Sequence, residues 1–414
     1  RYTETMRVLL INKFHYLKGG AERAYFDTAH ILAENGHAVA FFAMEHPENL
    51  DTPWSRFFVS QVNYHDQAAG LMSKLRAATR IIWNHEAAKN LEALIEEFKP
   101  EVAHLHNTYH QLSPSIIWTL RKHGVRIVMT LHDYKLISPN YSLLVRGKIW
   151  DHTSGWRAIL DRAVQDSYVK SAICAIEKWF HTLLGTFGKV DAFVAPSHFL
   201  IEKFQSVGFS HPIQHVVQQI RPFPKAPTTR GGEYLLFIGR LSEEKGIGTL
   251  IEACALMQGD IGLKIIGAGP EESLLREQAK SVPGVEFLGY QTGAAWEQAL
   301  QGAKALVVPS IWYENMPYVV LEALSRGKPV IATRLGGVPE RITGMLEGAA
   351  IGGVAAPLIA DVAIPGAVQL YRGARAGTEY ARRALMSARD PQQYALETVA
   401  DRALAWDHWA RRLV

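Results

Sequence analysis

Two glutamates eight residues apart, Glu314 and Glu322, flank the predicted start of a short helix between two apolar runs. Pro317 suits the first position of this helix, because the N–H that proline lacks would have no partner there, and Gly327 suits its end. The N–H groups of residues 315–319 would then point outward beyond a strand end, where parallel sheets bind ligands and an anion is favoured. Carboxylates beside such a site suit a ligand that carries both phosphate and hydroxyl groups. The alternative is that both glutamates are ordinary surface acids.

A second set of charged residues follows the apolar run 234–239. Arg240 and Lys245 stand after this predicted strand, and Gly246 leads from them into a predicted helix. A guanidinium and an ammonium at a strand end can neutralise a diphosphate, the first with paired N–H groups and the second as a point charge. Solvated surface charges are the alternative. The next strand leads into a glycine turn at 267–270, which by itself is weak evidence of a ligand site.

The first half of the chain has two more candidate sites at predicted strand ends. Gly19 and Gly20 follow the apolar run 6–12 and open a helix, so a ligand can approach the backbone closely there, although the dinucleotide-binding pattern G-x-G-x-x-G is absent. A flexible connection is the alternative. His132 and Asp133 follow a buried strand, at the edge where ligands bind. The alternative here is a capping aspartate beside a surface histidine.

His104 and His106 lie on the same face of another predicted strand. A metal site is one interpretation, but no aspartate, glutamate or cysteine accompanies the pair at the spacing of metal ligands. We therefore expect a polar strand end that lines a cleft, and no metal.

Three motifs resemble those of retaining glycosyltransferases with the GT-B fold, specifically glycosyltransferase family four, and above all the bacterial enzymes that build surface polysaccharides. They are E-x7-E at 314–322, GGVPE at 336–340 and G-R-L-x-x-E-K-G at 239–246, and the resemblance runs to about residue 341. It implies an α/β protein of two Rossmann-like, doubly wound domains that face each other across a cleft, with a C-terminal helix that crosses back to the first domain.

The resemblance also implies an activity: retaining, metal-independent transfer of a hexosyl group from a nucleotide diphosphate sugar to a saccharide or a lipid-linked saccharide, in glycan biosynthesis. The catalytic residues that it implies are Glu314, Arg240, Lys245 and His132, the last as a contact of the donor sugar. The donor-binding residues that it implies are Gly19, Gly20, Gly239, Gly267, Gly269, Asn315, Met316, Pro317, Tyr318 and Glu322.

The acceptor is expected to contact the first domain, through Asp133, Tyr134 and His106. No D-x-D motif stands at a strand end, so neither a metal nor another cofactor is expected, and Arg240, Lys245 and the helix terminus must stabilise the leaving diphosphate. The nucleotide diphosphate sugar is a co-substrate, and a UDP-sugar is favoured over a GDP-sugar.

The composition is that of an ordinary globular protein, with 414 residues, 48% of them apolar and 20% charged. The net charge of +4 is too small to imply nucleic acid, but it suits phosphate-bearing ligands or an anionic membrane surface. Two cysteines, Cys174 and Cys254, fit a reducing cytosol rather than a disulfide framework. Neither a signal peptide nor a membrane-spanning apolar run is evident, so we expect a cytoplasmic protein, with peripheral contact at the inner membrane face as a further expectation.

The predicted organisation is an acceptor domain at 1–222, a Pro- and Gly-rich linker at 223–232, a nucleotide-sugar domain at 233–393 and a helix at 394–414 that packs on the first domain. Strands of the first domain are predicted at 6–12, 38–43, 102–106, 126–131, 192–195 and 213–217. The segment 344–368 is rich in Ala and Gly, and it lacks the turn and strand usual in the family.

A long helical stretch is predicted from Trp156 to Lys189, with Tyr168, Trp179 and Leu183 among the apolar residues near one face. The preferred interpretation is a helix pair that packs this face into the core and leaves a solvated basic face. The alternative is a surface that meets lipid or a lipid-linked acceptor.

Two other functions remain open. One is a sugar-nucleotide epimerase or phosphorylase on the same fold. The other is a carbohydrate-binding protein that has lost catalysis, for which the unusual segment after residue 341 speaks. Arg240, Lys245, Glu314 and Glu322 are all present, which argues against lost catalysis.

Overall fold

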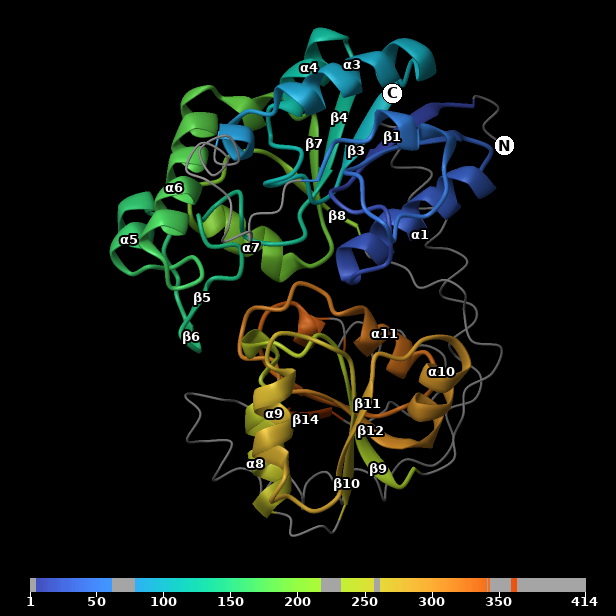
Figure 1. Cartoon of the computed structure of the whole chain (residues 1–414), viewed down its shortest axis with the longest axis vertical. Helices are drawn as coiled ribbons and strands as arrows, with labels where there is room; N and C mark the ends of the chain where they lie inside the picture. Colours follow the sequence, from blue (N-terminus) through green and yellow to red (C-terminus); the bar gives the residue numbers. More distant parts are fainter. Residues whose placement is uncertain are drawn as a thin grey trace. The chain divides into compact units, whose positions relative to one another are not determined.

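The computed structural model describes residues 5–61, 79–216, 232–256, 261–340 and 342, and the backbone of the strand at 359–362 (Figure 1). The chain divides into two compact units. Of the described residues, 5–61, 79–145 and 151–216 belong to the first unit, and 146–150 and those from 232 onward belong to the second. The predicted C-terminal helix at 394–414 and most of the predicted linker at 223–232 lie outside the described residues.

The first unit contains a parallel sheet with the strand order β2-β1-β3-β4-β7-β8. Its strands are β1 (Arg7–Ile11), β2 (Ala38–Phe42), β3 (Val102–Leu105), β4 (Arg126–Thr130), β7 (Ala192–Ala195) and β8 (Ile213–His215). All the predicted strands are present. The inner strands are buried on both faces and mostly apolar, as in other parallel sheets, whereas the edge strand β8 is Ile-Gln-His and largely exposed. The order places β3 beside β4, so the residues that follow these two strands meet at the same edge.

Helices flank this sheet. They are α1 (Gly20–Glu34), α3 (His85–Phe98), α4 (Ile116–Lys122), α5 (Gly155–Leu160), α6 (Tyr168–Leu183) and α7 (His198–Ser206), with the single turns η1 (Pro53–Phe57) and η2 (Thr186–Lys189). The short strands β5 (Leu144–Val145) and β6 (Lys148–Ile149) follow the turn after β4. Side-chain caps set several helix starts, as where Asn84 Oδ1 accepts a hydrogen bond from Ala87 N at 3.0 Å.

The second unit has a parallel sheet with the strand order β11-β10-β9-β12-β13-β14. Its strands are β9 (Tyr234–Ile238), β10 (Gly262–Ile266), β11 (Val285–Gly289), β12 (Ala303–Val308), β13 (Val330–Thr333) and β14 (Ile359–Val362). Its helices are α8 (Ile247–Leu256), α9 (Glu272–Ala279), α10 (Gly293–Gly302) and α11 (Tyr318–Leu324), with the turn η3 (Glu243–Lys245). Two apolar clusters, one around Leu306 and one around Ile265, bury its strands.

The Ala- and Gly-rich segment 344–368 lacks the strand sequence that is usual in the family, yet it contains β14. This strand pairs in parallel with β13, with Val330 opposite Ile359. The pairing requires only backbone N–H and C=O groups, so an unusual Ala- and Gly-rich sequence can still form it. The remainder of 344–368 lies outside the described residues.

The predicted helical stretch from Trp156 to Lys189 forms a pair of helices, α5 and α6, with a turn between them. Three residues between α5 and α6, Arg162, Gln165 and Asp166, have φ of 51°, 52° and 50°, a left-handed backbone that no α-helix contains. Ser167 then starts α6, where its side chain accepts a hydrogen bond from Lys170 N.

The prediction that the apolar face of this stretch packs into the core is wrong for several of its residues. Trp156, Tyr168 and Leu183 are 69%, 58% and 85% exposed. Within the part of the chain that the structure describes, no helix is both long enough and apolar enough to cross a membrane.

Candidate functional site

A buried carboxylate lies beyond the carboxyl end of β12. Glu314 is 5% exposed, and its Oε1 accepts hydrogen bonds from Lys245 Nζ at 2.6 Å and from Ser310 Oγ at 2.6 Å. Burial acts to raise the pKa of Glu314, but Lys245, Ser310 and Trp312 outweigh it and the pKa is lowered. The structure therefore brings two predicted catalytic residues together, one as an ionised carboxylate and the other as its cationic partner.

The loop that carries Glu314 is held by the GGVPE segment. Gly337 N donates a hydrogen bond to Glu314 O at 2.7 Å. Gly336 has a φ of 68°, and a Cβ built there would lie 2.0 Å from the same oxygen, so only glycine fits. Thr333 Oγ1 also donates to Ser310 O at 2.6 Å, which ties the loop to the end of β13.

Arg240 follows β9 and is exposed, and its guanidinium forms no hydrogen bond or ion pair with the described residues. Glu322 is half-buried in α11, and Arg326 fastens this helix to α10 by two hydrogen bonds of 2.8 Å to Glu297. α11 begins at Tyr318, so Pro317 takes the N-cap position rather than the predicted first helical position. Asn315 and Met316 are buried beside it.

Three predicted donor-binding glycines pack the loops after β9 and β10 against each other. Gly239 N donates to Ile266 O at 3.0 Å. A Cβ on Gly267 would lie 1.8 Å from Gly239 O, and one on Gly269 would lie 2.2 Å from Leu241 O. These contacts account for the glycines by loop packing, and their contact with a donor stays a prediction.

Histidines gather at the carboxyl ends of β3 and β4 in the first unit. His106 Nδ1 lies 2.9 Å from His132 Nε2, and the two rings stack with centroids 5.1 Å apart. His106 also packs against His104 with ring centroids 4.4 Å apart and the rings tilted by 32°, and His104 Nε2 lies 2.7 Å from Thr130 Oγ1. His106 Nε2 is buried and has no hydrogen-bond partner among the described residues.

All three rings are neutral at physiological pH. Burial lowers the pKa of His104 to about 3 and that of His132 to about 4. For His106, burial and then the neighbouring His104 and His132 hold the pKa well below its usual range. A neutral ring offers one N–H donor and one acceptor, so this cluster can bind hydroxyl groups but provides no charge.

The predicted acceptor residues fall in different environments. Burial raises the pKa of Asp133 to about 6, and Asp133 Oδ1 accepts a hydrogen bond from Lys135 N at 2.9 Å. Tyr134 is fully buried and His106 is 2% exposed. Of the three, Asp133 remains best placed for a direct acceptor contact, because burial disfavours the other two.

The predicted glycine loop leads into α1. Gly19 takes an extended conformation at the N-cap, and α1 begins at Gly20. A Cβ on Gly19 would lie 3.6 Å from Glu22 Oε2. Glu22, which is 5% exposed, accepts a hydrogen bond from Asn12 Nδ2 at 3.3 Å, so a buried carboxylate that the sequence reasoning missed lies directly behind the loop.

One group of potential metal ligands is present among the described residues. His110, Cys174 and Glu177 offer ligand atoms within 4.8 Å of one another. Lys135 Nζ lies 2.8 Å from Glu177 Oε2, however. Burial acts to lower the pKa of Lys135, but the neighbouring Glu177 and Cys174 outweigh it and the pKa is raised. The positive charge that a metal would supply is already provided by the ammonium group, so this cluster is a buried ion pair that joins the turn after β4 to α6.

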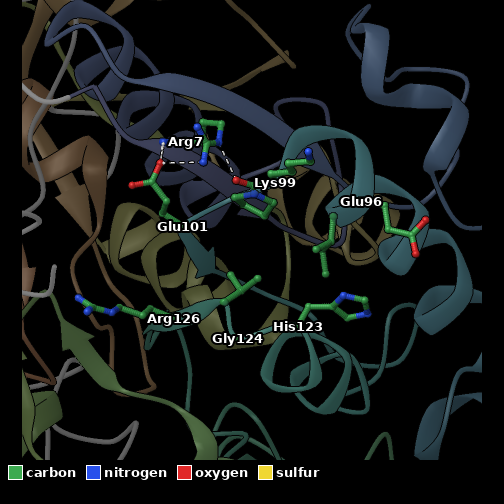
Figure 2. Close-up of a pocket in the computed structure, with 10 residues that line it drawn as sticks. Arg7, Glu96, Lys99, Glu101, His123, Gly124 and Arg126 are labelled. Carbon is green, nitrogen blue, oxygen red and sulfur yellow. Dashed lines mark hydrogen bonds and ion pairs between the residues drawn. The ribbon is translucent and has the colours of Figure 1, made fainter.

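A hollow of about 610 Å³ lies at the opposite edge of the first sheet, at the amino ends of β1 and β4 (Figure 2). Arg7 Nε donates to Lys99 O at 2.6 Å and Arg7 N donates to Glu101 Oε1 at 3.1 Å. Figure 2 shows His123 and Arg126 on its other side. Ligands of parallel sheets bind at carboxyl ends, so this hollow is not part of the candidate site.

Two family models match the chain. Residues 18–217 match the model described as Glycosyltransferase Family 4, and residues 232–360 match the model described as Glycosyl transferases group 1. Over 350 residues, 81% of this chain, the sequence is 28% identical to an uncharacterized 42.6 kDa protein in the cps region of Klebsiella pneumoniae, and the match covers 87% of that protein.

Solved structures share the fold. Sucrose-phosphate synthase from Thermosynechococcus elongatus has a TM-score of 0.61 at 18% identity over 99% of each chain. Alr3699/HepE from Anabaena, in complex with UDP and glucose, has a TM-score of 0.61 at 14% identity over 98% of each chain. With two parallel α/β units, these matches define a glycosyltransferase of the GT-B type. The first part of the chain therefore carries a Glycosyltransferase Family 4 domain and the second a Glycosyl transferases group 1 domain, and the predicted fold and family resemblance are confirmed.

Proposed function

We propose that this protein transfers a hexosyl group from a nucleotide diphosphate sugar to a saccharide with retention at the anomeric carbon. The observation that carries the proposal is the contact between Lys245 and Glu314. The lysine is held at the carboxyl edge of the second sheet and its side chain remains 22% exposed, so it can still meet a ligand. Arg240, at the same edge, is exposed and unpaired within the described residues.

These groups suit the departure of a diphosphate. Negative charge develops on the leaving oxygen as its bond to the sugar breaks, and preorganised cations stabilise that charge. Arg240 can donate paired N–H groups to phosphate oxygens, and Lys245 adds a point charge. Because two side chains supply the positive charge, we propose that the reaction needs no metal.

Glu314 has two tasks in this proposal. As a buried carboxylate with a lowered pKa, it holds the Lys245 side chain in place through a hydrogen bond and an ion pair. It also faces the developing positive charge of the sugar, or accepts hydrogen bonds from donor hydroxyls. Glu322 binds a ribose hydroxyl, and neutral His132 contacts the donor sugar.

The donor is proposed to be a UDP-sugar in preference to a GDP-sugar, with no other cofactor. The structural neighbour from Anabaena that holds UDP and glucose supports this choice. A thermal-shift screen should give larger increases in unfolding temperature with UDP-sugars than with GDP-sugars, and the reverse order would overturn the choice of nucleotide.

The acceptor is proposed to be a saccharide on a lipid carrier, reached from the inner face of the cytoplasmic membrane. The relative encoded in a cps region supports a role in polysaccharide synthesis. Asp133 is the proposed acceptor contact, since its raised pKa lets it take a proton from an attacking hydroxyl more readily than an ordinary carboxylate would.

The test is release of nucleotide diphosphate from the sugar nucleotide, with and without a saccharide acceptor, together with proton NMR of the product anomer. A transferase releases nucleotide only with acceptor, and retention gives a product with the anomeric configuration of the donor. Conversion of the donor without acceptor would identify an epimerase instead, and binding without release would identify a carbohydrate-binding protein. An inverted product would overturn the retaining mechanism alone.

A further inference from the structure

Helix α6 has its polar and apolar residues on the unexpected sides. Besides Cys174 and Ala175, the side chains that it buries are polar: Ser171, Glu177 and His181. Each has a partner inside the unit, since Ser171 Oγ accepts from Val164 N, Glu177 pairs with Lys135, and His181 Nε2 lies 2.8 Å from Ile82 O.

The outward side of α6 is apolar. Val169, Ile176, Phe180 and Leu183 follow each other at spacings of seven, four and three residues, which places them on one face. They are 68%, 46%, 36% and 85% exposed. A helix that satisfies its polar groups inside and turns its apolar side chains outward is suited to a second, apolar environment.

Aromatic residues from α5 extend this face, and Figure 1 shows α5 beside α6 in green. The rings of Trp156 and Trp179 lie 5.1 Å apart, and both side chains are exposed, as is Tyr168 at the start of α6. Of the sixteen exposed large hydrophobic residues in the described part of the chain, nine lie between residues 156 and 184, so the exposure is concentrated on this surface. We call it the α5–α6 face, and its apolar members are Trp156, Leu160, Tyr168, Val169, Ile176, Trp179, Phe180, Leu183 and Leu184.

The charges around the face indicate what covers it. Arg157, Arg162 and Lys170 lie on or between the two helices. The two arginines have i,i+4 aspartate partners, an arrangement that is weak at a surface, and Arg162 also lies over the Tyr168 ring. Residues 1–222 contain 24 Lys and Arg against 20 Asp and Glu, whereas residues 223–414 contain 20 of each, so the whole positive excess lies in the part of the chain that carries this face.

We propose that the α5–α6 face seats the protein on an anionic lipid surface. Trp and Tyr rings concentrate at the level of lipid headgroups, aliphatic side chains enter the acyl boundary, and basic side chains meet the anionic headgroups. This gives a location to the membrane contact of the proposed function, and it does not depend on the chemistry at Glu314.

The test uses the full chain and vesicles of phosphatidylcholine with and without phosphatidylglycerol. Val169→Gln and Leu183→Gln are combined, because both side chains are largely exposed and glutamine removes apolar surface without adding charge. The matched control combines Leu274→Gln and Tyr290→Gln, which are 65% and 67% exposed in the second unit. Co-sedimentation gives the partition coefficient for each protein.

The expected result is binding of the wild-type chain and the control to anionic vesicles, with a partition coefficient about tenfold or more lower for the Val169/Leu183 variant. Binding should also weaken on vesicles without phosphatidylglycerol and at high salt. Transfer to a water-soluble acceptor should be equal in all three proteins, which separates this surface from the proposed activity.

Equal partitioning of the two double variants would overturn the proposal, as would failure of the wild-type chain to bind anionic vesicles. Light scattering measures the oligomeric state and so tests the alternative that a second copy of the chain covers this face. If the wild-type protein is a dimer, the Val169/Leu183 variant a monomer, and vesicle binding the same for both, the face is a self-interface and the lipid proposal is wrong.

Discussion

The two sheets have the same parallel architecture, yet the groups at their carboxyl ends differ in charge. In the second unit Glu314 stays ionised although it is buried, because Lys245 Nζ lies 2.6 Å from its Oε1. In the first unit His104 and His132 stay neutral, because burial lowers their pKa values to about 3 and about 4. Burial by itself selects the neutral form, and a close opposite charge reverses the outcome.

This difference separates the tasks of the two edges. The second unit can stabilise charge that develops on a diphosphate, whereas the histidine cluster can only orient hydroxyl groups through hydrogen bonds. Changes in charge should therefore be most damaging in the second unit, and changes in hydrogen-bonding shape should dominate in the first.

Lys245→Ala should have the largest effect. It removes a cation proposed to face the diphosphate and leaves the buried Glu314 carboxylate unpaired, so it should cost roughly 2–4 kcal/mol of transition-state stabilisation, and Arg240→Ala should cost a similar amount. Lys280→Ala, at an exposed lysine whose partner is Glu277, is the control and should leave kcat/KM unchanged. A change of less than threefold in kcat/KM for Lys245→Ala would contradict the charge assignment.

The glutamates eight residues apart should differ in the kinetic constant that they affect. Glu314→Gln removes the buried charge beside Lys245, so it should lower kcat more than it raises the donor KM. Glu322→Gln weakens a proposed ribose contact that exists in both ground and transition states, so it should chiefly raise the donor KM. Unchanged donor affinity in Glu322→Gln would remove the ribose role.

The sequence predicted the elements that local pattern controls. Continuous apolar runs located the inner strands of the first sheet. A strand that is buried on both faces has apolar residues at successive positions, so it does not show the polar–apolar alternation of a half-exposed strand. The residues at strand ends followed from that, and the structure brings together Lys245 and Glu314, which are 69 residues apart. That contact could not be read from spacing, since it depends on how the turns after β9 and β12 approach each other.

The apolar periodicity of α6 did not predict which of its faces is buried, because polar side chains of this helix have partners inside the unit. The pattern of α6 was read as an apolar face in the core, but Lys135 provides Glu177 with a buried partner from a distant turn. Because Glu177 and His181 have partners inside the first unit, they occupy the buried face of α6, and the apolar residues of its opposite face are exposed. Lys135, in the segment that follows β4, was the available signal for this inversion.

His106 should affect activity through His132. His106→Phe keeps a ring between His104 and His132 but removes the nitrogen that lies 2.9 Å from His132 Nε2, so it should lower kcat by about tenfold as His132 loses its fixed orientation. His106→Asn, whose amide stands near the position of Nδ1, should retain much of the activity. In a His132→Phe background the two His106 variants should be equal, and a persistent difference between them there would show that His106 acts by another route.

The last prediction concerns acid stability and His104. Between the ordinary histidine pKa of 6.5 and the folded value of about 3, the unfolded chain binds a proton at this position that the folded chain excludes. Stability must therefore fall as the pH falls through this window, by up to about 1.4 kcal/mol per pH unit for one such group. His104→Gln can keep the hydrogen bond to Thr130 without titrating, so its unfolding temperature should decrease less steeply than that of the wild type between pH 6.5 and 5. His30→Gln, at an exposed position of α1, should follow the wild-type slope. If His104→Gln and the wild type lost stability in parallel, burial would not be holding this ring neutral, and the contrast between the two edges would rest on the charged pair alone.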